Sequence, residues 1–326
     1  TAIVLYKYEK EFSFKKRTKV VCQIVKYADP LEVRIIQVLG HPDDAGVDIS
    51  AMLTSNQVRQ VFNGKIVKEC KRTPAKVQKD ELENRKDLRN LLTVTIDGDD
   101  AKDFDDAISI VKNEKGYLLY VHIADVSHYV KENSALDQEA YLRGNSIYVC
   151  DRVVPMLPFD LSNGICSLNP SVDRLTITCA MQVDERGNLL TYNVFPSVIH
   201  SDKRCTYKKV NACLAADETI LEEYSEVKDL LFTLESLAKL LKKQSHNRGC
   251  IDFNTKEAKI IMDKNGYPVD VTVTYPDGSE DKVQVTVTVK EQKDNEKYIP
   301  EFDQINKNYG LSLIHISEPT RLRRIS

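Results

Sequence analysis

The residues of this chain that could do chemistry are concentrated in one acidic stretch, residues 95–107, which reads TIDGDDAKDFDDA. Six of the ten residues from 97 to 106 are acidic, yet strand-forming runs, LLTVTI and AISIV, lie on both sides. Carboxylates within about 4–6 Å raise one another's pKa unless a cation lies among them. Mg²⁺ binds carboxylates, water and phosphate oxygens, so the stretch predicts a Mg²⁺ site.

Two other interpretations of this stretch are disfavoured. A solvated acidic loop would have no use for Phe104 or for strand-forming runs on both sides. An EF-hand calcium loop fails on spacing, because the sixth position counted from Asp97 is Lys102 rather than Gly, and no Glu closes the loop. The sequence also shows no Ser/His/Asp triad, phosphate-binding Gly-rich loop or dinucleotide-binding fingerprint.

Four motifs carry a resemblance to a known family. The acidic stretch is followed by HIADVSHYV (residues 122–130), YVCDRVVPMLP (residues 148–158) and LSNGICSLNPSVDRLT (residues 161–176). In order and spacing these motifs resemble the catalytic domain of the ribonuclease II/ribonuclease R family, the RNB exoribonucleases. The resemblance implies a Mg²⁺-dependent 3′-to-5′ exoribonuclease that hydrolyses single-stranded or structured RNA and releases nucleoside 5′-monophosphates.

The same resemblance assigns roles to individual residues. It makes Asp97, Asp103, Asp105 and Asp106 the metal-binding and catalytic carboxylates, and we expect Asp105 to matter most for the rate. Tyr148 matches the family's tyrosine near the 3′ end of the RNA, where a ring can stack on a base. Because Tyr148 lies between Ile and Val, a strand core residue is the alternative.

Other polar residues of the motifs receive weaker assignments. Asp99 and Asp100 match a less constrained part of the family motif and are expected to be solvated turn residues. His122 and Asp125 are expected to form a buried structural pair, and His128 has no predicted role.

Composition limits the class of protein. The net charge of −3 does not indicate a general nucleic-acid binder, so any RNA-binding charge must be local. No apolar run approaches the roughly 20 residues of a membrane span. Eight cysteines without a C-x-x-C pair are typical of reduced thiols, so we expect a cytoplasmic protein. We also expect a monomer. The absence of an initial Met favours a fragment that begins within a domain.

The predicted fold is α+β, a partial RNB domain preceded by the end of a cold-shock-like (OB) β-barrel. Strand-forming runs at residues 2–6, 19–25 and 32–39 are followed by a helical connection with candidate helices at residues 47–53 and 57–62. The expected parts are residues 1–40 (end of the cold-shock/OB-like domain), 41–85 (connecting helical segment), 86–271 (truncated RNB domain), 272–310 (Rib-like β segment) and 311–326 (non-native tail).

Local signals predict several elements of the RNB part. Residues 107–111 and 117–121 should form a hairpin, and residues 175–183 should form another with residues 189–195. Ser134 should cap a helix over residues 135–143 that Gly144 stops. Apolar residues at three- and four-residue steps from Leu221 to Leu241 predict one long helix that ends near Arg248 and Gly249.

The C-terminal part departs from this pattern. Residues 272–290 alternate Thr and Val and, with the residues after them, resemble a Rib-type repeat of bacterial surface adhesins. Residues 311–321 resemble the translation of a sequencing adaptor. The hypothesis is an assembly chimera of an RNB fragment, an adhesin fragment and read-through, and the alternative is an unusual natural C-terminal domain.

The chain also lacks the arginine motif that the family uses on the scissile phosphate. We therefore expect poor turnover by this chain. A noncatalytic RNA-binding relic is the alternative function, and a surface-adhesion fragment is a third that only the C-terminal part favours.

Overall fold

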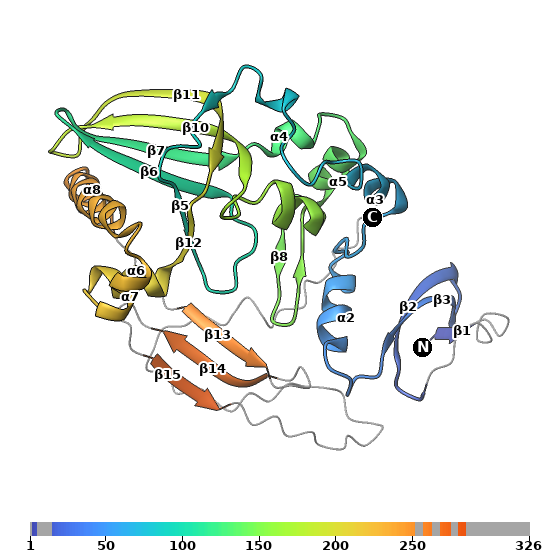
Figure 1. Ribbon diagram of the computed structural model, residues 1–326. Helices are drawn as coiled ribbons and strands as arrows, with labels where there is room; N and C mark the ends of the chain where they lie inside the picture. Colours follow the sequence, from blue (N-terminus) through green and yellow to red (C-terminus); the bar gives the residue numbers. More distant parts are fainter. Residues whose placement is uncertain (1, 5–14, 252–256, 263–267, 275–279, 285–326) are drawn as a thin grey trace. The chain divides into compact units, whose positions relative to one another are not determined.

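The computed structural model describes residues 2–4, 15–251, 257–262, 268–274 and 280–284 (Figure 1). The chain divides into two units, Thr1–Val285 and Thr286–Ser326, and the second lies outside the described residues. The fold of the first unit is α+β, as predicted. In the described part of the chain no helix is long and apolar enough to cross a membrane.

The N-terminal part is a three-stranded sheet followed by two helices. The sheet has the order β1-β3-β2, and its strands match the predicted strand-forming runs. The bounds are β1 (Ala2–Val4), β2 (Lys19–Lys26), β3 (Leu31–Gly40), α2 (Val47–Ser55) and α3 (Gly64–Cys70).

The predicted helix over residues 57–62 is wrong. Gln57 has a φ of 57°, in the left-handed region that ends a helix, and the next helix begins at Gly64. The side chain of Asn63 caps α3 by accepting hydrogen bonds from the N–H groups of Lys65 and Ile66. The spacing of apolar residues alone therefore predicted a helix at residues 57–62, whereas the helix lies at Gly64–Cys70.

A seven-stranded sheet forms the main body, in the order β12-β5-β6-β7-β10-β11-β4. Its two predicted hairpins are confirmed as the antiparallel pairs β6/β7 and β10/β11, whereas β4 and β12 join the sheet in parallel. The bounds are β4 (Lys86–Asp87), β5 (Val94–Asp97), β6 (Asp106–Asn113), β7 (Gly116–Ala124), β10 (Asp173–Val183), β11 (Leu189–His200) and β12 (Lys203–Thr206).

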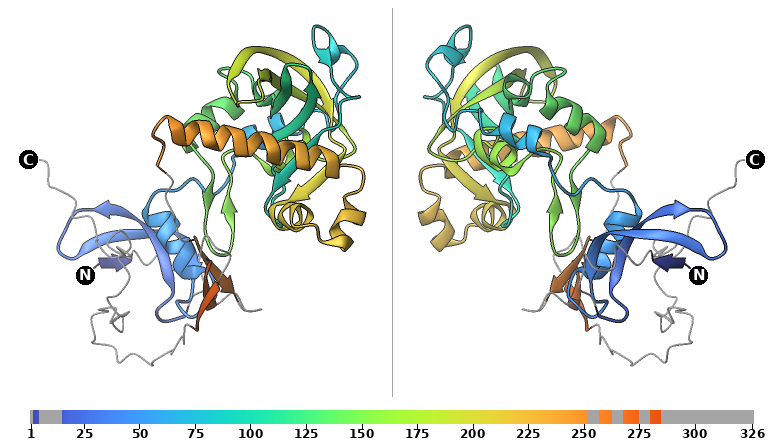
Figure 2. Two further views of the ribbon diagram at one scale, coloured as in Figure 1. Left: turned by 90° about the vertical axis from the view of Figure 1, so that its left-hand side faces the viewer. Right: turned by 90° about the vertical axis from the view of Figure 1, so that its right-hand side faces the viewer.

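A long helix, α8 (Lys228–Asn247), lies along one face of this sheet (Figures 1 and 2). Its buried side chains Leu230, Leu231 and Leu237 belong to the same apolar cluster as Ile110 of β6 and Tyr117 of β7. Burial of these leucines stabilises the helix by roughly 1.5–3 kcal/mol for each side chain. The helix α6 (Tyr207–Leu214) precedes it and packs against it.

The predicted end of the long helix near Arg248 is confirmed, because α8 ends at Asn247 with Arg248 as its C-cap. The prediction of a single helix from Leu221 onward is wrong, because the chain forms α7 (Glu218–Glu223) and then α8. Tyr224 and Val227 lie between the two helices and are 1% and 0% exposed. Their φ angles of −103° and −119° are outside the helical range. The spacing of apolar residues continues across the break because both helices bury side chains in one core.

The remaining helices and strands of this part of the chain are short. The predicted helix over residues 135–143 is confirmed with both of its ends, since Ser134 accepts a hydrogen bond from the N–H of Asp137 and Gly144 has a φ of 77°. The bounds are η1 (Asp80–Leu82), α4 (Val126–Tyr129), α5 (Ala135–Arg143), β8 (Ile147–Tyr148), β9 (Val153–Val154) and η2 (Asp160–Ile165).

The last described strands form a separate antiparallel sheet, β13 (Glu257–Met262), β14 (Pro268–Thr274) and β15 (Glu280–Gln284). The strand β14 spans the predicted boundary between residues 271 and 272, and it pairs with a strand from either side. The boundary stays a prediction, and the predicted tail at residues 311–326 lies outside the described residues.

Candidate active site

The acidic stretch connects two adjacent strands of the main sheet. β5 ends at Asp97 and β6 begins at Asp106, and the two strands are antiparallel with Val94 paired to Ile108. The first and last of the predicted carboxylates therefore belong to neighbouring strand ends, and the remaining ones come from the connection between them.

Phe104 fixes this connection to the body of the domain. Its side chain is 4% exposed, and its N–H donates to the Ser167 hydroxyl at 3.0 Å. Its carbonyl accepts from the N–H of Leu168 at 2.9 Å, and the Ser167 hydroxyl donates to the carbonyl of Lys102. The guanidinium of Arg204 lies 5.3 Å from the Phe104 ring. The backbone that carries Asp103 and Asp105 is thus held from both sides.

The predicted carboxylates are electrostatically coupled. Loss of hydration raises the pKa of Asp105, and the charges of Asp103, Asp106 and Asp97 raise it further. Loss of hydration and the charge of Asp97 likewise raise the pKa of Asp106. Asp105 therefore responds to the charges of the other three predicted site carboxylates.

The two remaining acids of the stretch, Asp99 and Asp100, are exposed and contribute to neither of these pKa shifts.

The carboxylates have the right donor chemistry for a hard divalent cation, because their mutual repulsion is what a bound cation would relieve. Among the residues that the structure describes, however, no group of three or more His, Cys, Asp or Glu side chains is arranged to hold a metal ion. The donor type therefore fits Mg²⁺, whereas a ready-made set of ligands is not formed.

Tyr148 lies beside these carboxylates. It ends β8, its side chain is 68% exposed, and its hydroxyl donates to Oδ2 of Asp103 at 3.1 Å. Loss of hydration, the hydrogen bond and the charge of Asp103 raise the pKa of Tyr148. The alternative of a strand core residue is wrong, because the ring is exposed.

The residues that hold the β8/β9 hairpin at its base were not predicted from the sequence. Glu139 is 4% exposed and forms ion pairs with Arg59 at 2.6 Å and Arg143 at 3.0 Å. Arg143 also donates to the carbonyl of Pro155, directly after β9, and lies 3.7 Å from the Phe62 ring. The four-residue spacing of Glu139 and Arg143 on a predicted helix could have indicated that pair.

His122 and Asp125 are both buried, as expected, but they do not form a pair. The ring of His122 lies between the hydroxyls of Ser109 and Thr178, at 3.0 and 2.7 Å, and burial lowers its pKa to about 4. Asp125 instead forms an ion pair with Arg85 at 2.5 Å. Neither residue belongs to the carboxylate group.

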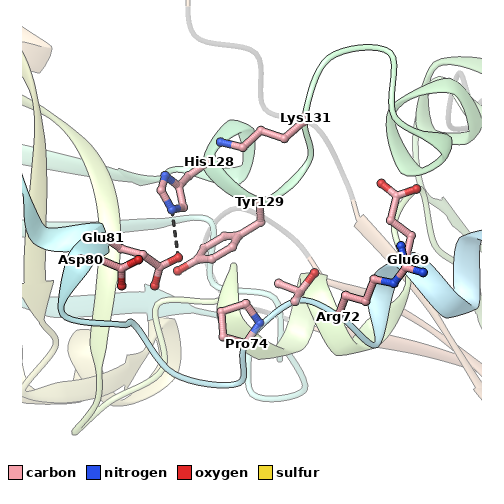
Figure 3. Close-up of a pocket in the computed structure, with 9 residues that line it drawn as sticks. Glu69, Arg72, Pro74, Asp80, Glu81, His128, Tyr129 and Lys131 are labelled. Atoms are coloured by element: carbon pink, nitrogen blue, oxygen red, sulfur yellow. Dashed lines mark hydrogen bonds and ion pairs between the residues drawn. The ribbon is translucent and has the colours of Figure 1, made fainter.

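A pocket in the described part of the chain lies away from the acidic stretch. It has a volume of 480 Å³ and is lined by residues of both charges from the connecting segment and the end of α4. Figure 3 shows the ring of His128 joined to Glu81, and this contact measures 2.9 Å. Tyr129 and Lys131 also line the pocket, but no residue of the acidic stretch does.

Comparison with known proteins places the chain in a family. Residues 85–304 match the RNB domain and residues 4–63 match a cold shock domain. The chain belongs to the RNB-domain family. The predicted family and the predicted cold-shock-like N-terminal part are confirmed. The match to the RNB domain extends past the predicted boundary at residue 271, so that boundary stays a prediction.

Individual relatives agree with this assignment. Ribonuclease R of Thermotoga maritima is 47% identical over 264 residues, which cover 79% of this chain and 37% of that protein. Ribonuclease R 1 of Lactococcus lactis is 44% identical over 247 residues, 76% of this chain and 30% of that protein. The chain therefore spans less than two fifths of the length of these curated relatives.

This chain is similar to a solved structure of Mycoplasma genitalium RNase R in complex with ribose-methylated single-stranded RNA, with a TM-score of 0.76 and 33% sequence identity. The similarity covers 84% of this chain and 43% of that one.

Proposed function

We propose that this chain carries the metal-binding side of the active site of a ribonuclease R-type enzyme, a 3′-to-5′ exoribonuclease that hydrolyses RNA to nucleoside 5′-monophosphates with Mg²⁺. It acts as a monomer in the cytoplasm. The observation that carries the proposal is the group of four coupled aspartates at adjacent strand ends of an RNB domain. Relatives solved with single-stranded and with double-stranded RNA support RNA as the ligand.

The four aspartates have the metal-binding role in this proposal. Asp97, Asp103, Asp105 and Asp106 would hold Mg²⁺, which supplies an activated water and neutralises charge on the scissile phosphate when bound. Asp105 is the most rate-critical, because its carboxylate responds to the charges of the other three.

Tyr148 has two functions in this proposal. Its hydroxyl orients Asp103, and its exposed ring offers a stacking surface to a base near the 3′ end, worth about 1–3 kcal/mol.

Asp105→Asn tests the metal-binding role, with Asp100→Asn as the matched control on the same connection. Each variant is made in a chain completed with the C-terminal half of a family member and is incubated with end-labelled single-stranded RNA and Mg²⁺. Monophosphate release is followed, and RNA binding is measured separately by fluorescence anisotropy. Asp105→Asn should abolish hydrolysis and keep RNA binding, because it removes charge at the metal rather than the binding surface. Asp100→Asn should behave like the unmodified chain. Equal loss of binding and turnover in Asp105→Asn would assign that residue a structural role.

The alternative function, a noncatalytic RNA-binding relic, gives a different result in the same assay. A relic binds RNA with the same affinity whether Mg²⁺ or EDTA is present, and it releases no monophosphate. An Mg²⁺ requirement for tight RNA binding would contradict the relic.

We also propose that the 326-residue chain turns over RNA slowly. The family's arginine motif is absent from its sequence, and loss of one preorganised charge-stabilising donor can cost about 10²–10³ in rate. Turnover close to that of a full-length relative, abolished by Asp105→Asn, would show that the described RNB part is sufficient.

A further inference from the structure

The β8/β9 hairpin, which carries Tyr148, is held together by very few strand contacts. Only two positions are paired, Ile147 with Val154 and Tyr148 with Val153. A two-stranded hairpin is marginally stable by itself in water even when it is longer than this one. The place of the Tyr148 ring beside Asp103 therefore depends on the contacts that the rest of the chain makes with the hairpin.

The base of the hairpin is held by two hydrogen bonds. The Arg143 side chain donates to the carbonyl of Pro155 at 3.0 Å, and the N–H of Met156 donates to the Ser146 hydroxyl at 3.0 Å. Both contacts lie just outside the paired strands. They fix where the hairpin leaves the domain, but they do not reach its tip, residues 149–152.

The tip is joined to α2 by Arg152. Its guanidinium donates through Nη1 to the Ser50 hydroxyl at 3.2 Å and through Nη2 to the carbonyl of Gly46 at 3.3 Å. Nε donates to Oδ2 of the neighbouring Asp151 at 3.0 Å, which orients the guanidinium. Ser50 lies within α2 and Gly46 is its N-cap, 102 and 106 residues before Arg152 in the chain. Arg152 thus connects the tip of the Tyr148 hairpin to a distant helix.

The start of α2 is shaped to receive this tip. Gly46 has a φ of 75°, and a Cβ at this position would lie 2.6 Å from Nη2 of Arg152 and 2.7 Å from Oδ2 of Asp151. The helix begins without a side-chain cap. The Asp151 carboxylate lies beside this N-terminus, where a negative charge is favourable. Glycine therefore permits the close approach, and the charges of the tip suit the end of the helix.

We infer that Arg152 is a positioning residue for the proposed active site, which holds Tyr148 beside Asp103 by fixing the hairpin tip to α2. The inference rests on the proposed function, because it concerns the placement of a residue of that site. Gly46 and Ser50 belong to the part of the chain that matches a cold shock domain, whereas Arg152 belongs to the part that matches the RNB domain. The contact therefore makes the position of Tyr148 depend on α2, in the N-terminal part.

The first measurement needs no RNA. 3-Fluorotyrosine is incorporated at position 148 of the full 326-residue chain, and its ¹⁹F resonance is recorded at one pH with and without Asp103→Asn. That substitution should shift the resonance while the ring lies beside Asp103. The shift should largely disappear in Arg152→Ala, and also in Gly46→Ala, which displaces the tip from the other side of the contact. Arg186→Ala is the matched control, an exposed arginine in the turn of the β10/β11 hairpin, and should keep the shift.

The second measurement asks whether Arg152 acts on RNA through Tyr148. A fluorescein-labelled single-stranded RNA of about eight nucleotides, a typical site size, is titrated by anisotropy in EDTA, which prevents turnover. Tyr148→Leu should weaken binding by about fivefold or more, the loss expected for one stacked base. Arg152→Ala should cause part of that loss alone and no further loss when combined with Tyr148→Leu, because the two residues act as one unit.

A conservative variant and a stability check accompany these titrations. Arg152→Lys keeps the charge but lacks the fork of donors that reaches two acceptors, so its affinity should lie between those of Arg152→Ala and the unmodified chain. Thermal unfolding shows whether each variant is folded.

Two results overturn the inference. If Asp103→Asn shifts the resonance as strongly in Arg152→Ala as in the unmodified chain, the hairpin keeps its place without this contact. If Arg152→Ala costs the same RNA affinity with and without Tyr148, it does not act through that ring. Failure of the unmodified chain to bind RNA would count against the proposed function, whereas the resonance would still decide the role of Arg152. The two failures are therefore distinguishable.

Discussion

Acidification should destabilise this fold through His122. Its side chain is fully buried and its pKa is lowered to about 4, whereas in the unfolded chain its pKa is about 6.5. Between these values the unfolded chain binds a proton that the folded chain does not. The contribution of His122 to stability is therefore complete above pH about 6.5 and is lost as the pH falls toward 4.

The size of the effect follows from the two pKa values. Over the whole window the loss is about 3 kcal/mol, because each unit of pKa difference is worth about 1.4 kcal/mol. Between pH 7 and pH 5, part of that window, one-proton linkage gives about 2 kcal/mol. This is a large share of the roughly 5–15 kcal/mol that stabilises an ordinary domain.

Urea unfolding at pH 7 and pH 5 measures it, with the unmodified chain, His122→Gln and His246→Gln compared. His246 is a suitable control because it is exposed in the last turn of α8. The unmodified chain and His246→Gln should lose about 2 kcal/mol more on acidification than His122→Gln, in which the titrating group is missing. An equal loss in all three proteins would show that His122 is not held neutral by burial and would refute the structural reading of the Ser109 and Thr178 contacts.

Three further predictions concern the residues around the site. Glu139→Ala should lower the free energy of unfolding by about 3 kcal/mol, because it leaves two arginines without their buried partner, while Glu235→Ala, an exposed ion pair, should cost under about 1 kcal/mol in the same urea titration. Phe104→Ala should cost about 3–5 kcal/mol and also weaken Mg²⁺ binding in calorimetry, and unchanged Mg²⁺ affinity would contradict its role in holding the carboxylates. Asp103→Asn should lower the raised pKa of Asp105, measured by carboxyl NMR, since it removes a neighbouring negative charge, and a constant pKa would refute the coupling.

The elements that the sequence predicted correctly are those with a local physical signal. Both hairpins have strand-forming runs joined by a short turn, and Gly116 supplies the φ of 115° that one turn requires. The helix after Ser134 has a capping side chain at one end and a glycine at the other, so both of its ends could be placed. In each case the information lies within a few residues of the element.

The features that were predicted wrongly or missed depend on contacts between distant parts of the chain. The break between α7 and α8 is set by the burial of Tyr224 and Val227 in a core shared with the sheet, which spacing along one helix cannot reveal. Glu139 meets Arg59 across 80 residues of sequence. His122 finds its partners on two neighbouring strands rather than on the adjacent Asp125. The motif predicted that His122 and Asp125 are buried. Only the pairing of the strands shows which groups form hydrogen bonds with His122.

The acidic stretch itself could be interpreted from sequence because of Phe104. Phe104 is buried whereas Asp105 beside it is exposed, so the connection directs its ring into the core and leaves the Asp105 carboxylate outside it. The hydrogen bond that the Phe104 N–H donates to Ser167 and the one that its carbonyl accepts from Leu168 then keep that orientation while the carboxylates repel one another. A solvated loop would relax to separate the charges, whereas this one is held with its pKa values raised. The fold thus maintains an unfavourable concentration of negative charge at one place, which is the condition under which a divalent cation binds with the greatest gain.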